Sequence, residues 1–318
     1  MAENAGYEIV NAVIEEVKKA VTGRDDCVKK AFAAILAGGH VLIEDVPGVG
    51  KTTLALSFSR AMKLEEHRVQ FTPDVMPSDL IGFSMYKKDI DQFEYHPGAV
   101  QCNLFLGDEI NRTSPKTQSA LLEVMEEGAY TVDGVTRKVP EPFIVIATQN
   151  PKGSAGTQLL PESQLDRFMI CISMGYPDLE TEIRIAKGRN NGVSVKNVNP
   201  IIGAAELNAL KKQVAECFIH DNVYTYIAKL IQATRENPYV ELGVSPRGTI
   251  AFTRMAMAWA FLHGRDYVIP GDVEDVFPDV VGHRLVLNTK ARVARVNTRD
   301  VISEILGSIR QPTSFMRG

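Results

Sequence analysis

The chain has 318 residues, of which 45% are hydrophobic and 23% charged, a composition that is ordinary for a folded globular protein of about two domains. Its net charge of −4 argues against a broad nucleic-acid-binding face, because such faces are usually basic. The 4 cysteines are far apart and the 6 histidines show no ligand spacing, so neither a disulfide framework nor a zinc site is expected.

The N-terminal segment predicts helices rather than a targeting signal. Residues 7–19 carry apolar side chains at helical spacing, and residues 28–36 predict a second helix. Residues 1–20 contain acids and no apolar signal-peptide core, and the longest apolar stretch, 255–262, is too short to span a bilayer. We therefore expect a cytoplasmic protein without membrane insertion.

The first candidate site is a glycine-rich turn between a predicted strand and a predicted helix. Residues 40–44 form a short apolar run that is typical of a buried parallel strand, and a helix is expected over residues 51–62. The intervening run EDVPGVGKTT therefore has the strand–turn–helix context that a phosphate-binding loop requires.

The residue types of this run suit the phosphates of a nucleotide. Gly48 and Gly50 allow backbone N–H groups to turn toward an anion, and the helix N-terminus adds a positive dipole end. Lys51 supplies a positive charge to the β and γ phosphates, and Thr52 offers a hydroxyl to magnesium. Asp45 replaces the first glycine of the usual pattern, so a tight turn without a ligand is the alternative. The residues expected to bind the phosphates are Gly48, Val49, Gly50, Lys51, Thr52 and Thr53.

Alternating strands and helices follow, which predicts an α/β fold with a three-layer parallel sheet. A helix is expected from the N-cap Ser114 to residue 127, because Ser followed by Pro is a common helix start. Hairpins are expected at residues 82–97 and 130–137, the second around an Asp-Gly turn. Further strands of the sheet are expected at residues 68–71, 103–106, 143–147 and 171–174.

The composition becomes polar and rich in turn residues at 188–200, which predicts a domain boundary. Beyond it the sequence shows helices interrupted by Gly and Pro, and no long strand. We therefore predict a nucleotide-binding α/β domain over residues 1–190 and a small all-helical lid domain over residues 191–318.

Polar side chains close two of the predicted strands. Asp108 and Glu109 follow an apolar run, and beside a phosphate-binding loop these acids could hold magnesium through water and polarise an attacking water. The alternative is a solvated strand end. Asn150 closes another strand, where its amide could orient the same water or touch the γ phosphate, although Asn before Pro is also a common turn residue.

Two arginines are candidates for contact with a nucleotide. Arg167 could point at the nucleotide of a neighbouring subunit, or it could pair with Asp166 or another acid of its own chain. Arg247 lies in the first turn of a predicted helix capped by Ser245, where a cation opposes the helix dipole. A nearby anion would remove that conflict, so Arg247 is a candidate phosphate ligand, with a simple surface arginine as the alternative.

With these residues in view, the sequence resembles the MoxR family of AAA+ ATPases over nearly its whole length. The resemblance implies an AAA+ core followed by a lid, and the two hairpins resemble the insertions of the helix-2-insert clade. In that clade the lid packs differently, so Arg247 could act across a subunit interface. The most specific segments are GGHVLIEDVPGVGKT, DEINRTSPKTQSALLEVMEEGAYTVDG, IATQNP, LPESQLDRF and SPRG.

The resemblance also implies ATP and Mg²⁺ as cofactors and a hexameric ring with sites at subunit interfaces. The segment of Val21, Thr22 and Gly23 matches the one that lines the adenine pocket. The implied roles are nucleotide loop for Lys51 and Thr52, magnesium and water activation for Asp108 and Glu109, first sensor for Asn150, arginine finger for Arg167 and second sensor for Arg247.

As a member of such a family, the protein is expected to be an ATP-driven, chaperone-like remodeller of protein partners, working with a separate protein that has a von Willebrand factor A domain. Three alternatives stay open: a nucleic-acid motor, a magnesium-chelatase-like motor subunit, and a nucleotide-bound scaffold without turnover. Arg137 and Lys138, on the second hairpin, are the residues that keep the nucleic-acid motor open, while the acidic net charge speaks against it.

Overall fold

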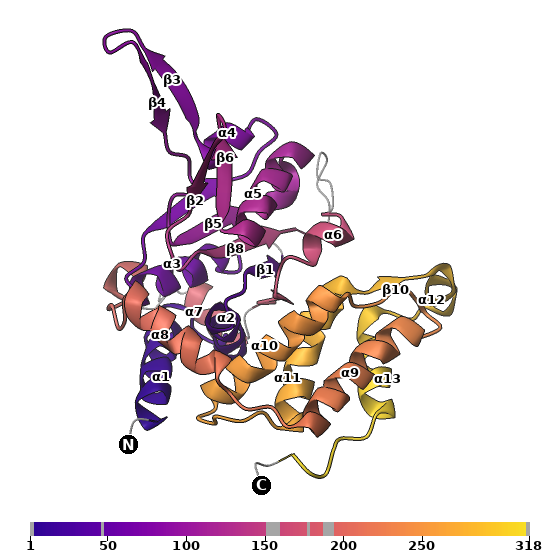
Figure 1. Cartoon of the computed structure of the whole chain (residues 1–318). Coiled ribbons are helices and arrows are strands. Elements are labelled where there is room, and N and C mark those ends of the chain that lie inside the picture. Colours follow the sequence, from indigo (N-terminus) through magenta and orange to yellow (C-terminus); the bar gives the residue numbers. More distant parts are fainter. Residues whose placement is uncertain (1–2, 46–47, 151–159, 177–178, 187–193, 316–318) are drawn as a thin grey trace.

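The computed structural model describes residues 3–45, 48–150, 160–176, 179–186 and 194–315. A five-stranded parallel sheet forms the centre of the first half of the chain (Figure 1). Its order differs from the order along the chain, as expected for strands joined by crossover helices. From one edge to the other, the strands are β2 (Glu66–Gln70), β5 (Leu104–Asp108), β8 (Ile144–Gln149), β1 (Val41–Glu44) and β9 (Ile170–Ile172).

Helices cover both faces of the sheet, because successive side chains of its strands are apolar on both sides. Val41 and Ile43 of β1 belong to the core cluster that contains α1, α2 and α3, whereas Leu42 belongs to the cluster that contains α5. This alternation places the two clusters on opposite faces and produces the three-layer arrangement. The helices of this half are α1 (Glu3–Ala20), α2 (Asp25–Leu36), α3 (Lys51–Ala61), α4 (Pro77–Ile81), α5 (Pro115–Glu127), α6 (Glu162–Leu165) and α7 (Leu179–Ala186).

Two antiparallel hairpins extend this half, and both were predicted from the sequence. The first, β3 (Phe83–Lys87) with β4 (Gln92–His96), projects away from the sheet at the top of Figure 1. The second is β6 (Ala129–Val132) with β7 (Val135–Lys138), whose turn uses positive φ at Asp133 and Gly134, as an Asp-Gly turn requires. The 3₁₀ turns are η1 (Ile110–Arg112), η2 (Val195–Asn197) and η3 (Gly282–Arg284).

The C-terminal part is a helical lid that packs against α1, α2 and β9, and its core is continuous with the core cluster of α1 to α3. It also contains one element that the sequence analysis missed, a short antiparallel pair of β10 (Val240–Leu242) with β11 (Val286–Leu287). The predicted boundary at 190 and 191 lies outside the described residues and stays a prediction. The lid helices are α8 (Ala204–Ala215), α9 (Asp221–Glu236), α10 (Pro246–Leu262), α11 (Pro270–Val281), α12 (Thr289–Ala294) and α13 (Thr298–Ser308). In the part of the chain that the structure describes, no helix is both long and apolar enough to cross a membrane.

Helix α5 runs antiparallel to the strands, and His40 ties its end to the opposite edge of the sheet. The helix starts beyond the carboxyl end of β5, at the N-cap Ser114, whose side chain accepts from the Thr117 N–H. At its other end, the Met125 carbonyl lies 3.0 Å from His40 Nε2, directly before β1. His40 Nδ1 lies 3.0 Å from the Val145 N–H, which donates to it, so Nε2 carries the proton that Met125 accepts. The last turn of α5 therefore lies on the side of the sheet where its strands begin, which is here called the amino edge; the side where the strands end is the carboxyl edge.

The buried imidazole of His40 makes stability sensitive to pH. Burial lowers the pKa of His40 to about 4, from an ordinary value of 6.5 in the unfolded chain. Because the unfolded state takes up this proton first, stability is complete above pH 6.5 and is lost as the pH falls toward 4. We expect the His40 contribution to the unfolding free energy to fall by about 2 kcal/mol between pH 7 and pH 5. Urea unfolding of the wild type and of His40→Asn at both pH values measures it; equal pH dependence of the two proteins would contradict the assignment.

Candidate functional site

The carboxyl ends of β1, β5 and β8 meet at one edge of the sheet, because these strands are neighbours and parallel. The glycine-rich turn follows β1, Asp108 and Glu109 end β5, and Asn150 follows β8. The Asp45 N–H donates to the Gln149 carbonyl at 3.2 Å, which joins the start of the turn to the end of β8. The structure therefore brings together Lys51, Asp108 and Glu109, which the sequence analysis proposed as one site.

The glycine-rich turn has the backbone shape that an anion site requires. Gly48 and Gly50 have φ values of 87° and 99°, which only glycine adopts without strain. A Cβ added at Gly48 would meet no atom of the described residues within 4 Å. Helix α3 begins at Lys51 without a side-chain cap or an acid in its first turn, which leaves its N–H groups available to an anion. Residues 46 and 47 lie outside the described residues.

Lys51 begins α3, and three acids lie near its ammonium group. Its Nζ donates to the Asp45 carbonyl at 2.7 Å. Burial lowers the pKa of Lys51, and the charges of Asp45, Asp108 and Glu109 oppose that shift. An ammonium group has three protons to donate, so Lys51 keeps two for an anion such as a phosphate chain, whereas the neighbouring carboxylates suit a metal cation bound to that chain.

Asp45 has a structural use that the motif comparison did not reveal. Its Oδ2 accepts from the Gly175 N–H at 2.6 Å and from Ser173 Oγ at 3.1 Å, which ties the start of the phosphate turn to the segment after β9. The Gly175 carbonyl in turn accepts from Arg24 Nη2 at 2.9 Å. The residue that replaces the first glycine is thus a fixed anchor of the turn.

This chain of contacts also locates the proposed adenine segment. Val21 is buried, whereas Thr22 and Gly23 are exposed directly before Arg24. Because Arg24 contacts Gly175, and Gly175 contacts Asp45, the segment lies close to the glycine-rich turn. Its role in holding an adenine ring stays a prediction.

Asp108 and Glu109 are held by different partners. Asp108 is buried, and its Oδ2 accepts from Arg68 Nε at 2.7 Å. Glu109 is partly exposed, and its Oε2 accepts from Arg112 Nη1 at 2.7 Å and from Gln70 Nε2 at 3.1 Å. Its φ of 58° is unusual for a residue other than glycine, and such strain tends to occur at functional sites.

The donor set fits Mg²⁺ held together with a nucleotide. Asp108 supplies a carboxylate and Thr52 a hydroxyl, and Mg²⁺ prefers oxygen ligands and usually takes only one or two from the protein, with phosphates and waters completing its shell. The described residues contain no cluster of three His, Cys, Asp or Glu side chains that would hold a metal alone. A magnesium site here therefore depends on the phosphates.

Asn150 lies beside this cluster, and its carbonyl accepts from Asn111 Nδ2 at 3.3 Å. Asn111 is buried on η1, between Glu109 and α5. This contact places Asn150 at the same edge as the acids, while its contact with a water or a γ phosphate stays a prediction.

Arg167 and Arg247 lie together at the opposite edge. Arg167 Nε donates to Glu126 Oε2 at 2.9 Å and Nη1 donates to the Ser163 carbonyl at 3.0 Å, while Arg247 Nη2 donates to Glu126 Oε1. Arg167 thus pairs with an acid of its own chain, and that acid is Glu126, not Asp166. Because Glu126 is in the last turn of α5, the two arginines lie about 20 Å, the length of this helix, from the edge that carries Lys51.

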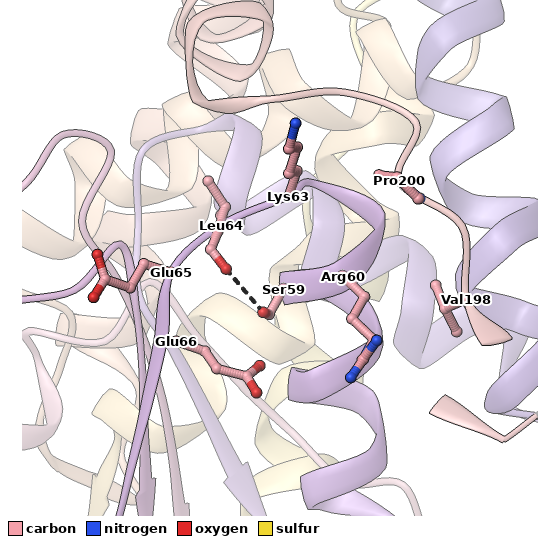
Figure 2. A pocket seen from close by; sticks show the side chains of 8 residues that line it. All are labelled: Ser59, Arg60, Lys63, Leu64, Glu65, Glu66, Val198 and Pro200. Carbon is pink, nitrogen blue, oxygen red and sulfur yellow. Dashed lines mark hydrogen bonds between the residues drawn. The ribbon is translucent and has the colours of Figure 1, made fainter. Parts of the chain in front are cut away.

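One hollow of the described surface lies away from the glycine-rich turn. A pocket of about 430 Å³ lies where the C-terminal end of α3 meets the start of β2 and the segment before the lid (Figure 2). Lys51 begins α3 and this pocket is at its other end, so the pocket is separate from the candidate site. Its lining residues are Ser59, Arg60, Lys63, Leu64, Glu65, Glu66, Val198 and Pro200.

Known proteins resemble this chain in sequence and in fold. Residues 40–170 match the model of the ATPase family associated with various cellular activities (AAA), and residues 232–305 match the AAA lid domain. An uncharacterized protein, YeaC of Bacillus subtilis, is 42% identical over 96% of both chains, and chaperone MoxR1 of Mycobacterium tuberculosis is 38% identical over 98% of this chain and 85% of its own. A crystal structure of a candidate ATPase from Cytophaga hutchinsonii has a TM-score of 0.89 and 36% identity, and the match covers 98% of this chain and 97% of that one.

Replacing Lys51 tests the site directly. Lys51→Ala removes the ammonium group beside the glycine-rich turn. We expect ATP affinity to fall about 10- to 100-fold, because one or two charge-assisted hydrogen bonds to the phosphates are lost. Isothermal titration calorimetry with ATP measures this change. Lys63→Ala is the matched control, since Lys63 follows the C-terminal end of the same helix; equal affinities of the two variants would refute the site.

Proposed function

The chain belongs to the MoxR family of AAA+ ATPases, and we propose that it binds ATP with Mg²⁺ and hydrolyses it at a site that a neighbouring copy completes. One observation carries this proposal. The phosphate turn and the acids lie at the carboxyl edge of the sheet, while Arg167 and Arg247 lie together at its amino edge. Each subunit therefore contributes its phosphate turn and acids to one ATPase site and its two arginines to the site of a neighbouring subunit.

The carboxyl-edge half binds the nucleotide and prepares the water. The turn at Gly48 and Gly50 and the Lys51 ammonium bind the phosphates, and Thr52 with Asp108 holds Mg²⁺, which neutralises phosphate charge when bound. Glu109 accepts a proton from the attacking water, for which its carboxylate must exchange its contact with Gln70 or Arg112.

Asn150 orients the same water from the neighbouring strand. Val49 and Thr53 complete the phosphate turn, and Val21, Thr22 and Gly23 contact the adenine. This division of roles follows the order of the strands, since the acids and the amide end adjacent strands β5 and β8.

The amino-edge half acts on the site of the next copy. Arg167 and Arg247 present guanidinium groups at the surface, where an arginine stabilises the charge of a phosphoryl-transfer transition state. A head-to-tail contact that joins one edge to the other repeats from copy to copy, and it closes into a ring when the rotation between successive copies completes a full turn. We propose a homo-oligomeric ring, and a hexamer as its size.

The proposed work of the ring is chaperone-like remodelling of protein partners, with a separate partner that has a von Willebrand factor A domain. MoxR1, 38% identical, is named a chaperone. The projecting β3–β4 hairpin supports a protein partner, because several of its large apolar side chains are exposed, and exposed apolar patches usually mark contacts with other proteins. These side chains are Phe83, Met85, Tyr86, Ile90 and Phe93.

The arrangement of Arg137 weakens the alternative of a nucleic-acid motor. Its Nη1 donates to the Val132 and Val135 carbonyls, and its guanidinium lies 3.8 Å from the centroid of the Tyr95 ring. An arginine bound in this way stabilises its own hairpin and is less available to a phosphate backbone. Lys138 is exposed but stands without a basic stripe.

Shared sites predict that activity depends on protein concentration. We expect the ATP hydrolysis rate per subunit to rise as the protein assembles, because each site needs an arginine of the next copy. Arg167→Ala is expected to lower the fully assembled rate by about 10³-fold, the usual contribution of such an arginine, with little change in ATP affinity. Phosphate release across a concentration series, with size-exclusion chromatography of the same samples, makes the measurement.

Glu109→Gln is the control, which binds ATP and is silent at every concentration. A wild-type rate per subunit that stays constant from monomer to assembly would rule out shared sites. A wild type as silent as Glu109→Gln would instead favour a nucleotide-bound scaffold.

A further inference from the structure

A buried arginine of the lid holds the segment that carries Arg167. Arg284 ends η3, and its side chain is 2% exposed. Its Nε donates to Asp166 Oδ1 at 2.7 Å, and its Nη2 donates to the carbonyls of Phe168 at 2.6 Å and Asp166 at 3.2 Å. Its Nη1 donates to the Met169 carbonyl at 3.1 Å and to Val280 within the lid. One guanidinium thus binds the backbone on both sides of Arg167.

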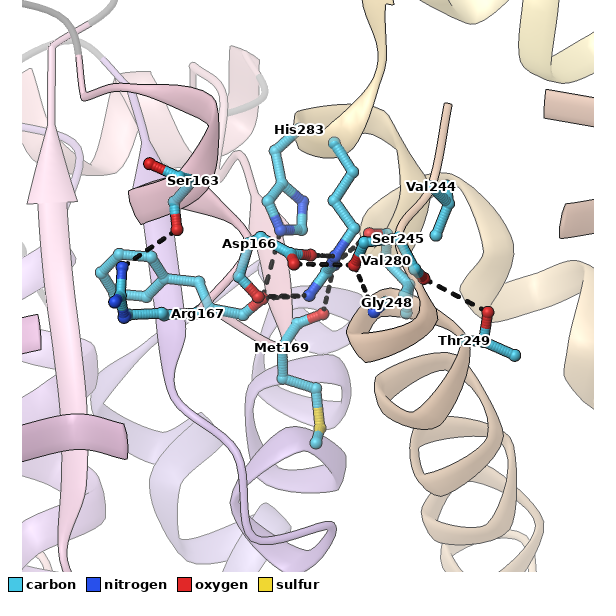
Figure 3. Close-up of polar contacts among 12 residues, drawn as sticks. Ser163, Asp166, Arg167, Met169, Val244, Ser245, Gly248, Thr249, Val280 and His283 are labelled. Atoms are coloured by element: carbon cyan, nitrogen blue, oxygen red, sulfur yellow. Dashed lines mark hydrogen bonds and ion pairs between the residues drawn. The ribbon is translucent and has the colours of Figure 1, made fainter. Parts of the chain in front are cut away.

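The other oxygen of Asp166 binds the helix that carries Arg247. Ser245 is the N-cap of α10, and its Oγ donates to Asp166 Oδ2 at 2.7 Å while it accepts from the Gly248 N–H at 3.0 Å. Figure 3 shows Asp166 between the Arg167 segment and the start of this helix. The Asp166 carboxylate therefore contacts both Arg284 and Ser245. Because Asp166 precedes Arg167 and Ser245 caps the helix that carries Arg247, this carboxylate connects the two segments that carry the arginines.

The same two arginines meet again at the surface, on Glu126. Glu126 lies on a third element, α5, so Arg167 and Arg247 are bound to it from two different domains. The contacts of Asp166 join the segments that carry the two arginines, and the surface contact at Glu126 joins their guanidinium groups. Both contacts must be kept for the two guanidinium groups to hold one relative position.

We propose that Asp166 and Arg284 are positioning residues that hold Arg167 and Arg247 in one fixed relative position. The orientation of the lid then determines where both guanidinium groups lie at the site of the next copy. This proposal rests on the proposed function, because it requires that the arginines act across the interface. It predicts that loss of the Asp166–Arg284 contact damages the neighbour's site and leaves the variant's own nucleotide loop intact.

The chemistry of the contact favours positioning over simple adhesion between domains. An apolar side chain would fill the space of Arg284, but it would not orient the carbonyls of Asp166, Phe168 and Met169, which lie on both sides of Arg167. His283 Nε2 lies 3.2 Å from the Phe168 carbonyl, so two consecutive lid residues contact the same segment. A misplacement of about 1 Å at a catalytic group far from the altered residue can cost about 100-fold in rate.

Subunit mixing tests the proposal. Arg284→Lys keeps the positive charge but removes the planar guanidinium that reaches several acceptors at once, and Asp166→Asn keeps the shape of the side chain but removes its charge. We expect each assembled variant to hydrolyse ATP about 10- to 100-fold more slowly than the wild type, with unchanged ATP affinity. Mixing either variant with silent Glu109→Gln should restore activity, because Glu109→Gln subunits supply intact arginines to intact sites; at equal amounts about a quarter of all sites become complete in a head-to-tail ring.

Two further variants make every outcome decisive. Arg265→Lys alters a second arginine–aspartate pair of the lid, in which the partly buried Arg265 contacts both oxygens of the buried Asp272, and it should keep the wild-type rate. Arg167→Ala mixed with Glu109→Gln must recover activity if the arginines act across the interface, and failure there overturns the proposed function itself. If that mixture recovers but the Arg284→Lys mixture does not, or if Arg284→Lys keeps the wild-type rate, the positioning role is refuted.

Discussion

The parallel direction of five strands is the constraint on which the rest of the structure depends. Parallel strands place all their carboxyl ends at one edge, and a crossover helix must return to the other edge before the next strand begins. The phosphate turn and both acids therefore collect at one edge. Helix α5 carries Glu126 back to the other edge, where it binds Arg167 and Arg247. The distance between the glycine-rich turn and the arginine pair is a consequence of the topology.

Different kinds of contact hold these two edges. At the carboxyl edge, Lys51 and Glu109 are partly exposed, which suits groups that exchange hydrogen-bond partners when an anion binds. At the junction with the lid, Arg284 is buried and its partner Asp166 is partly buried. A buried ion pair gives little net stability after the cost of removing its charges from water, but breaking it by removing one partner is strongly destabilising. Such a pair is better suited to define one arrangement of two domains than to increase their affinity.

The sequence was sufficient for most of the fold, and it proposed as one site the residues Lys51, Asp108 and Glu109 that the structure brings together, while their roles toward a nucleotide stay predictions. Lys51, Thr52, Asp108 and Glu109 were predicted because each lies in a short run whose meaning comes from its neighbours in the chain. The partners that hold the arginines were not predicted, because they are distant in sequence: Arg284 is 118 residues from Asp166, and Arg247 is 121 residues from Glu126. No local pattern marks such a pair. The β10–β11 pair escaped for the related reason that its strands are too short to show periodicity.

The position of the arginine pair at one edge and the phosphate turn at the other has a consequence for the count of working centres. For sites shared in this way, an open row of copies has one fewer complete centre than it has members, since the copy at one end has no donor and the copy at the other end has no recipient. Closure removes both ends at once. The last subunit to join then adds two complete centres where each earlier one added a single centre, so turnover itself would report whether the circle is closed.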